Sequence, residues 1–234
     1  VNMANEVMLR VAHKLKRIFL FLVAAQFIYI IVLKWVNPPI TLTQLGSVLN
    51  GNGLRRDYVS LRDISPQASL AVIAAEDQLF PDHNGFDIKS IQKALNSNKK
   101  KPSRIRGAST ISQQVAKNVF LWQGRSWLRK GMEVYFTFMI EMVWGKRRIL
   151  EVYLNVSEMG KGVFGIEAAA QKHFKKTAKK LTRTESAKIA ACLPNPKKYS
   201  VNPASNYILK RFPWVLRQMD NLRDDPDIER LLVP

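Results

Sequence analysis

Ser69-Leu-Ala-Val-Ile-Ala-Ala-Glu-Asp77 is a helix-forming, mostly apolar run that ends in two carboxylates. The apolar part predicts a helix that packs into a core. The acidic pair therefore stands at the C-terminal end of that helix, where the helix dipole disfavours negative charge. A sequence shaped by stability alone would rarely place acid there, so the pair indicates a functional site.

Two dense polar signatures lie on either side of a very basic stretch. The first begins with the acidic pair and reads Glu76-Asp77-x-x-Phe80-x-x-His83-x-Gly85. A helix-end carboxylate beside apolar groups can have a raised pKa and act as a general base, which makes Glu76 a candidate. The structural alternative is that Asp77 only pairs with Arg or Lys and that His83 only hydrogen-bonds a carbonyl. For His83 we favour this alternative.

The second signature is Gly107-Ala-Ser-Thr-Ile-Ser-Gln-Gln114, which is expected to start a helix at Ser109 or Thr110. Polar side chains recur every four residues on one face of this helix and continue beyond it: Ser109, Gln113 and Lys117, followed by Asn118 and Arg125. Donors and cations thus converge near a helix N-terminus, which attracts anions. On its own, the pattern is more typical of a solvated amphipathic face.

A further acid, Glu133, follows Arg129 by four residues, so the two side chains can pair along a helix. On an exposed face such a pair would add little stability and would say little about function. The residues alone therefore leave the role of Glu133 open.

Apolar periodicity predicts a mainly helical domain. Helices are expected over residues 65–79, 88–95, 129–144, 147–154, 164–174, 182–193 and 203–219. Pro213 predicts a kink or a break in the last of these helices. Residues 97–106 are expected to form a loop because five cations in ten residues cannot pack, and no alternating strand pattern is visible. The lone Cys192 lies in an apolar run and is expected to be buried.

An uncharged apolar segment at residues 18–33 predicts a membrane anchor. It is preceded by Arg10, His13, Lys14, Lys16 and Arg17, so the positive-inside rule places the N-terminus in the cytoplasm and the chain beyond the segment outside the cell membrane. No small-x-small site comes after the segment, which argues against a cleaved signal peptide. The expected organisation is a basic tail over 1–17, a transmembrane anchor over 18–36, a linker and membrane-proximal segment over 37–63, and a globular domain over 64–234.

The chain carries a formal net charge of +19, from 37 Lys and Arg against 18 Asp and Glu. Such an excess implies an anionic partner, which is a nucleic acid, an anionic membrane surface or a phosphorylated substrate. Because an exported domain meets no genome, nucleic acid is disfavoured. An apolar cluster at residues 120–122, 127–128 and 134–144 is either ordinary core or a face that dips into the outer leaflet of the membrane.

Four motifs in order resemble those of the family 51 peptidoglycan glycosyltransferases: Glu76-Asp-x-x-Phe80-x-x-His83-x-Gly85, Gly107-Ala-Ser-Thr-Ile-Ser-Gln-Gln114, Arg129-Lys-x-x-Glu133 and Lys146-x-x-Ile-Leu-Glu-x-Tyr-Leu-Asn155. The resemblance runs from about residue 64 to 219, with Arg211-x-x-x-Val215-Leu216 as a weaker fifth motif. It is closest to the membrane-anchored, monofunctional members, which lack a penicillin-binding transpeptidase domain. It implies a lysozyme-like helical fold at the bacterial cytoplasmic (inner) membrane, with the catalytic domain outside.

The resemblance also implies a reaction, in which lipid II is polymerised into peptidoglycan with inversion, formation of β-1,4 bonds and release of undecaprenyl diphosphate. Glu76 matches the catalytic base that takes the proton of the acceptor 4-hydroxyl. Glu133 matches a second essential carboxylate, which orients cations or helps to hold a divalent metal, Mg²⁺ or Mn²⁺; no organic cofactor is implied. Asp77 and Phe80 match residues that shape the acceptor side.

By the same resemblance, six residues are expected to contact sugar and phosphate oxygens: Ser109, Gln113, Lys117, Asn118, Arg125 and Arg129. Residues 97–106 match a mobile flap between the donor and acceptor subsites. The expected partners are lipid II, the growing lipid-linked strand, the membrane, and proteins of cell-wall synthesis or division.

Two other functions fit parts of the same pattern. A lysozyme-like lytic muramidase shares a helical domain with one catalytic Glu, but hydrolysis needs no phosphate cradle, so Lys117, Arg125 and Arg129 favour synthesis. A non-catalytic, membrane-anchored scaffold that binds anionic glycan or lipid would explain the charge, and in that case Glu76 would be dispensable.

Overall fold

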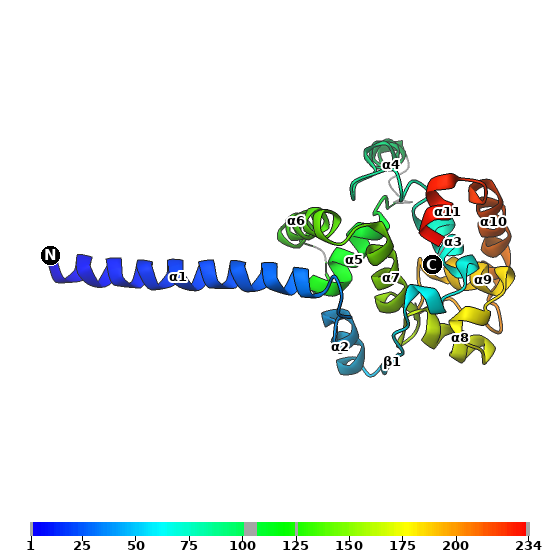
Figure 1. Ribbon diagram of the computed structural model, residues 1–234, viewed down its shortest axis with the longest axis horizontal. Coiled ribbons are helices and arrows are strands. Elements are labelled where there is room, and N and C mark those ends of the chain that lie inside the picture. The colour runs from blue at the N-terminus through cyan, green and yellow to red at the C-terminus, as the bar shows by residue number, and fades with distance from the viewer. Residues whose placement is uncertain (1, 101–106, 125, 233–234) are drawn as a thin grey trace. The chain divides into compact units, whose positions relative to one another are not determined.

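The computed structural model describes residues 2–100, 107–124 and 126–232 (Figure 1). By the contacts between residues, the chain divides into two units, Val1–Asn37 and Pro38–Pro234. The first unit contains the helix α1 (Asn2–Val32), which is long and apolar enough over Val7–Val32 to cross a membrane. This helix is compatible with the single-pass anchor that the sequence predicts.

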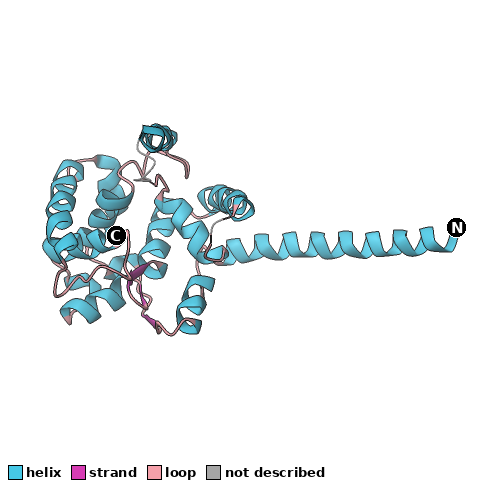
Figure 2. Ribbon diagram, turned by 180° about the vertical axis from the view of Figure 1, so that it is seen from behind, coloured by secondary structure: helices cyan, strands magenta, loops and turns pink. Residues whose placement is uncertain are grey.

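The second unit is mainly helical, as the sequence predicts, and helices dominate it in Figure 2. Its α-helices are α2 (Leu42–Leu49), α3 (Pro66–Glu76), α4 (Ile88–Lys100), α5 (Ile111–Phe120), α6 (Trp127–Val143), α7 (Lys146–Val156), α8 (Ile166–Phe174), α9 (Arg183–Cys192), α10 (Asn206–Leu222) and α11 (Pro226–Leu232). Two short 3-10 helices, η1 (Leu61–Asp63) and η2 (Ala178–Lys180), complete the helical elements of the described chain.

Three short strands form a small sheet that the sequence did not reveal. They are β1 (Arg55–Arg56), β2 (Glu158–Gly160) and β3 (Val163–Phe164), in the order β1-β3-β2. β3 pairs parallel with β1 and antiparallel with β2. Strands of two or three residues are too short to show an alternating pattern, which explains why none was visible.

The core is built around α3, which contacts α9, α10 and α11. Residues 68–74 of α3 are all buried, so the middle of this helix has no solvent face. A second group of contacts joins α5 to α6 and to α7. Burial of apolar surface in these two groups is the main favourable contribution to folding. The functional site lies where α3 ends and α5 begins.

Several element boundaries differ from the sequence expectation. The helix expected to end at residue 95 continues to Lys100, so residues 97–100 are helical rather than loop, and residues 101–106 lie outside the described chain. The expected linker contains α2, whose N-cap Thr41 forms a capping box with Gln44. Cys192 is buried, as predicted, and its thiol donates to the carbonyl of Tyr199.

Pro213 does not break α10, which is assigned as one helix from Asn206 to Leu222. A proline inside a helix removes one backbone hydrogen bond. α10 nevertheless packs against α3 and α9 and buries Ile208, Val215 and Met219. The apolar burial along its length offsets the lost bond, so of the predicted kink or break, the break does not occur.

Candidate active site

An open cleft of about 910 Å³ lies at the C-terminal end of α3. Its walls are the last turn of α3, part of α4, residues 107–110 and one side chain of α5. The polar side chains that line it include Glu76, Asp77, Lys93, Ser109 and Gln114. The two polar signatures of the sequence therefore meet in one cleft, although a basic segment separates them along the chain.

Glu76 is the last residue of α3 and is half-buried in this cleft. The side-chain amide Nε2 of Gln114 donates a hydrogen bond to its Oε2 at 2.7 Å. Burial raises the pKa of Glu76 above the usual 4.5, while the Gln114 hydrogen bond and the positive charge of Arg211 oppose that rise. A carboxylate with a raised pKa is a stronger proton acceptor, so Glu76 is suited to act as a general base.

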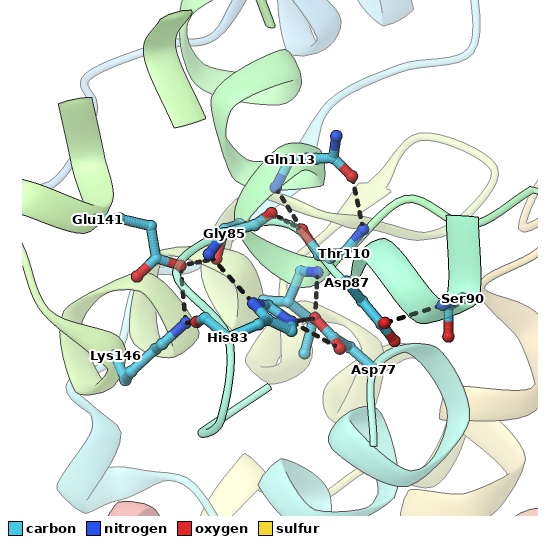
Figure 3. A network of polar contacts seen from close by, with 11 residues as sticks. Asp77, His83, Gly85, Asp87, Ser90, Thr110, Gln113, Glu141 and Lys146 are labelled. Atoms are coloured by element: carbon cyan, nitrogen blue, oxygen red, sulfur yellow. Dashed lines mark hydrogen bonds and ion pairs between the residues drawn. The ribbon is translucent and has the colours of Figure 1, made fainter. Parts of the chain in front are cut away.

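Asp77 also borders the cleft, but its carboxylate accepts hydrogen bonds from other residues of the domain (Figure 3). Oδ2 accepts the backbone N–H of Ile111 at 2.9 Å, and His83 Nε2 lies 3.0 Å from Oδ1. The N–H of Gly85 donates to His83 Nδ1, so the neutral ring carries its proton on Nε2 and donates it to Asp77. Asp77 thus joins the end of α3 to the start of α5, through a histidine and a backbone amide rather than the Arg or Lys of the structural alternative.

His83 therefore has a structural role, although its partner is a carboxylate rather than the carbonyl expected from sequence. Gly85 adopts a φ of +88°, and a Cβ there would lie 2.7 Å from the Thr137 side chain. Its carbonyl accepts a hydrogen bond from the hydroxyl of Thr110, the N-cap of α5, at 2.7 Å. The turn after α3 is in this way attached to the α5 N-terminus at two points (Figure 3).

Two residues predicted to bind substrate have other positions. Phe80 is fully buried and lies beneath the ammonium of Lys146, which is 4.7 Å from the ring centroid. It supports the turn from inside and does not line the cleft. Gln113 is also buried, and its Oε1 accepts the N–H of Thr110 in a capping box. The prediction of one polar face from Ser109 to Lys117 was therefore wrong, because Ser109 precedes the helix and Gln113 caps it.

A second charged group lies on α6. Glu133 is buried, with Arg129 at 2.8 Å and Lys130 at 2.6 Å from its two oxygens. The pairing of Arg129 with Glu133 is confirmed, and it is buried rather than exposed. Within the described chain, Arg129 Nε is buried without a hydrogen-bond partner. This donor is available to a ligand that enters the site.

The ammonium of Lys117 interacts electrostatically with both carboxylates of the site, Glu76 and Glu133. Burial lowers the pKa of its ammonium, while the charges of Glu133 and Glu76 both act to raise it. Lys117 is thus within electrostatic reach of both acids. The structure describes no hydrogen bond or ion pair of this ammonium with the described residues. A half-buried cation in such surroundings is suited to bind an anion.

Three of the residues predicted to bind substrate remain: Ser109, Asn118 and Arg125. Ser109 is exposed on the cleft and Asn118 is half-buried on α5, whereas Arg125 lies outside the described residues. Sequence reasoning did not assign a site role to Gln114 or to Arg211, although both belong to quoted motifs. The motifs were the only sequence signal, because the Gln114 hydrogen bond to Glu76 and the electrostatic effect of Arg211 on it arise only in the folded chain.

The described side chains do not fit a metal held by the protein. Among them no group of three or more His, Cys, Asp or Glu is close enough to hold an ion. Both oxygens of Glu133, the expected ligand, are occupied by cations. A divalent ion prefers several oxygen donors, so this donor set does not match it, and no chemical step is assigned to a metal here.

We predict that Asp77→Asn destabilises the domain. The carboxamide has one acceptor oxygen for two donors, and its NH₂ would face one of them, so the buried network loses about 2–4 kcal/mol. The melting temperature of the full chain in detergent should fall by roughly 5–10 °C, measured by circular dichroism. Asp87→Asn is the matched control, since Asp87 caps α4 through its Oδ1 and Asn caps equally well. Equal melting temperatures of wild type and Asp77→Asn would contradict the structural role of Asp77.

Comparison with known proteins agrees with this geometry. The family model described as Transglycosylase matches residues 43–220. The chain is 56% identical over 190 residues to the "Biosynthetic peptidoglycan transglycosylase" of Shigella boydii serotype 4 (strain Sb227), covering 80% of this chain and 78% of that protein. Proteins of the same name from Escherichia coli strains ATCC 8739 and K12 / DH10B show the same identity and the same coverage.

Proposed function

The chain belongs to the transglycosylase family, and from this premise we propose that it is a peptidoglycan glycosyltransferase that polymerises lipid II into glycan strands. The observation that carries the proposal is the position of Glu76, a half-buried carboxylate with a raised pKa that lines the cleft within reach of a cationic group. A general base with cations within its electrostatic reach is what transfer of a sugar from a diphosphate requires.

In this reaction, Glu76 accepts the proton of the 4-hydroxyl of the acceptor N-acetylglucosamine. The hydroxyl oxygen then forms a bond to the anomeric carbon of the donor N-acetylmuramic acid. The bond from that carbon to the diphosphate oxygen breaks at the same centre, and its electron pair leaves with undecaprenyl diphosphate. A single displacement inverts the anomeric carbon and needs no covalent glycosyl-enzyme intermediate.

Negative charge that develops on the leaving diphosphate is stabilised by the cations of α5 and α6. Within the described chain, Lys117 supplies an ammonium without a hydrogen bond or ion pair, and Arg129 supplies a buried donor that lacks a partner. Glu133 holds the guanidinium of Arg129 and the ammonium of Lys130 in place. Fixed donors of this kind stabilise a transition state without reorganisation, which is the usual source of large rate effects.

A lytic muramidase is the rival for the same fold. Hydrolysis needs a general acid and an activated water but no cations beside them, whereas Glu76 here lies within electrostatic reach of Arg211 and Lys117. The group formed by Lys117, Arg129 and Lys130 has no evident use in cleavage of a neutral glycosidic bond. The charge of the site therefore favours a donor with a diphosphate.

We further propose that α1 anchors the enzyme in the bacterial cytoplasmic membrane with its N-terminus inside and the second unit outside, because basic residues precede the apolar segment. The apolar cluster of the sequence divides into a buried part and an exposed part. Phe136, Met139 and Ile140 of α6 are buried core. The other side of α6 exposes Trp127, Leu128, Val134, Tyr135, Phe138 and Met142, with Trp127 92% exposed. This exposed apolar face is suited to contact the outer leaflet, where the lipid-linked substrate lies.

Glu76→Gln tests the base. Polymer formation from labelled lipid II should fall at least about 100-fold, because general-base catalysis contributes roughly that much or more. The melting temperature should stay the same or rise, since a carboxylate whose charged form is disfavoured by burial is replaced by a neutral amide. Glu229→Gln, on an exposed position of α11, is the matched control. Wild-type rates of polymerisation in Glu76→Gln would sink the proposal, whereas hydrolysis of glycan strands by the wild type that is lost in Glu76→Gln would favour the muramidase.

Lys117→Met tests the diphosphate site. The change removes the ammonium and keeps most of the stem, so the fold should be retained while kcat/KM for lipid II falls by about 100-fold, as when one fixed transition-state donor is lost. Steady-state kinetics with purified full chain gives the value. Lys210→Met, at an exposed position of α10, should behave like wild type. Unchanged kcat/KM in Lys117→Met would exclude Lys117 from charge stabilisation.

A further inference from the structure

We propose that Tyr153 and Gln114 form a hydrogen-bonded relay that positions the Glu76 carboxylate for proton transfer. This proposal rests on the proposed function, because it concerns how the base of that reaction is held. Tyr153 is a positioning residue in this account, since it acts only through Gln114 and does not touch the substrate.

The relay joins three helices. The hydroxyl of Tyr153, on α7, lies 3.3 Å from Oε1 of Gln114, on α5. Nε2 of Gln114 lies 2.7 Å from Oε2 of Glu76, at the end of α3. Tyr153 is only 1% exposed and belongs to the core between α5 and α7. A residue of the rigid interior therefore reaches the base through a single side chain.

The chemistry of the three groups sets the direction of the relay. A side-chain amide has one accepting end and one donating end, so it can serve a carboxylate only if its NH₂ points that way. Burial raises the pKa of Tyr153 well above 10, so its hydroxyl stays protonated and can donate to the amide oxygen. With Oε1 engaged by Tyr153, the NH₂ of Gln114 faces Glu76 and stabilises its charged form.

The relay also leaves one oxygen of the base free. Gln114 binds Oε2 of Glu76, and within the described chain no donor bonds to Oε1. Because Glu76 lines the cleft, this second oxygen is the one available to an acceptor hydroxyl. A fixed amide thus sets the rotation of the carboxylate, as a general base requires for a short and well-aligned proton transfer.

Tyr153→Phe removes the hydroxyl and keeps the ring. The expected result is a fall in kcat of about 10-fold, by analogy with misplacement of a catalytic group, with KM for lipid II unchanged. The acidic limb of the kcat–pH profile should move to higher pH, since Gln114 no longer holds its donor against the carboxylate and the charged form loses stabilisation. A residue with only a packing role would change the melting temperature without moving this limb.

Gln114→Met provides the second variant and completes a double-mutant cycle. If Tyr153 acts through Gln114, the Tyr153→Phe change should have no further effect on kcat in the Gln114→Met background. Tyr58→Phe, which removes a hydroxyl that accepts a hydrogen bond from Gln44 and has none to the three relay residues within the described chain, is the control and should leave both kcat and the pH profile unchanged. If Tyr153→Phe itself folds poorly, Gln114→Met alone must still shift the acidic limb to higher pH.

Two results would overturn the relay. One is a wild-type kcat and pH profile in Tyr153→Phe, and the other is a Tyr153→Phe effect of equal size with and without Gln114. Either result leaves the proposed function intact as long as Glu76→Gln is inactive. Failure of the proposed function itself would appear as full polymerisation by Glu76→Gln, so the two failures are distinguishable.

Discussion

The carboxylate of Asp77 is the contact on which the site depends. It accepts the first helical N–H of α5, from Ile111, and the ring N–H of His83. A negative charge at the end of α3 is unfavourable by the dipole of that helix, but it is favourable at the start of α5. The arrangement explains why acid stands at the end of a buried helix. Because Glu76 precedes Asp77 directly, the same contact fixes where the base enters the cleft.

Three residues along helix α5 each contribute a different interaction to the site. Ile111 receives Asp77 at its start, Gln114 reaches Glu76 one turn later, and Lys117 lies within electrostatic reach of both Glu76 and Glu133. Residues three apart on a helix lie close to one face, so one rigid element sets the positions of the base and of the cations relative to each other. A short helix of ten residues is thereby the frame of the whole catalytic arrangement.

Sequence reasoning predicted those features that depend on local patterns. The buried helix α3, the pairing of Arg129 with Glu133 and the mainly helical fold follow from periodicity and spacing. Contacts between distant residues were not predictable in the same way, because Asp77 and Ile111 are separated by 34 positions. Polar character also did not reveal that Gln113, at the third position of its helix, serves its own cap through Oε1.

The most direct test of this account is the pKa of Glu76 itself. Carbon-13 NMR of the full chain in detergent micelles, with labelled glutamate carboxyls, gives each titration midpoint, and the resonance lost in Glu76→Gln identifies the site. The account predicts a midpoint above the usual 4.5, because burial outweighs the Gln114 hydrogen bond and the nearby positive charges. A midpoint at or below 4.5 would contradict the claim that the position of Glu76, at the end of α3 and held beside α5, makes it a general base.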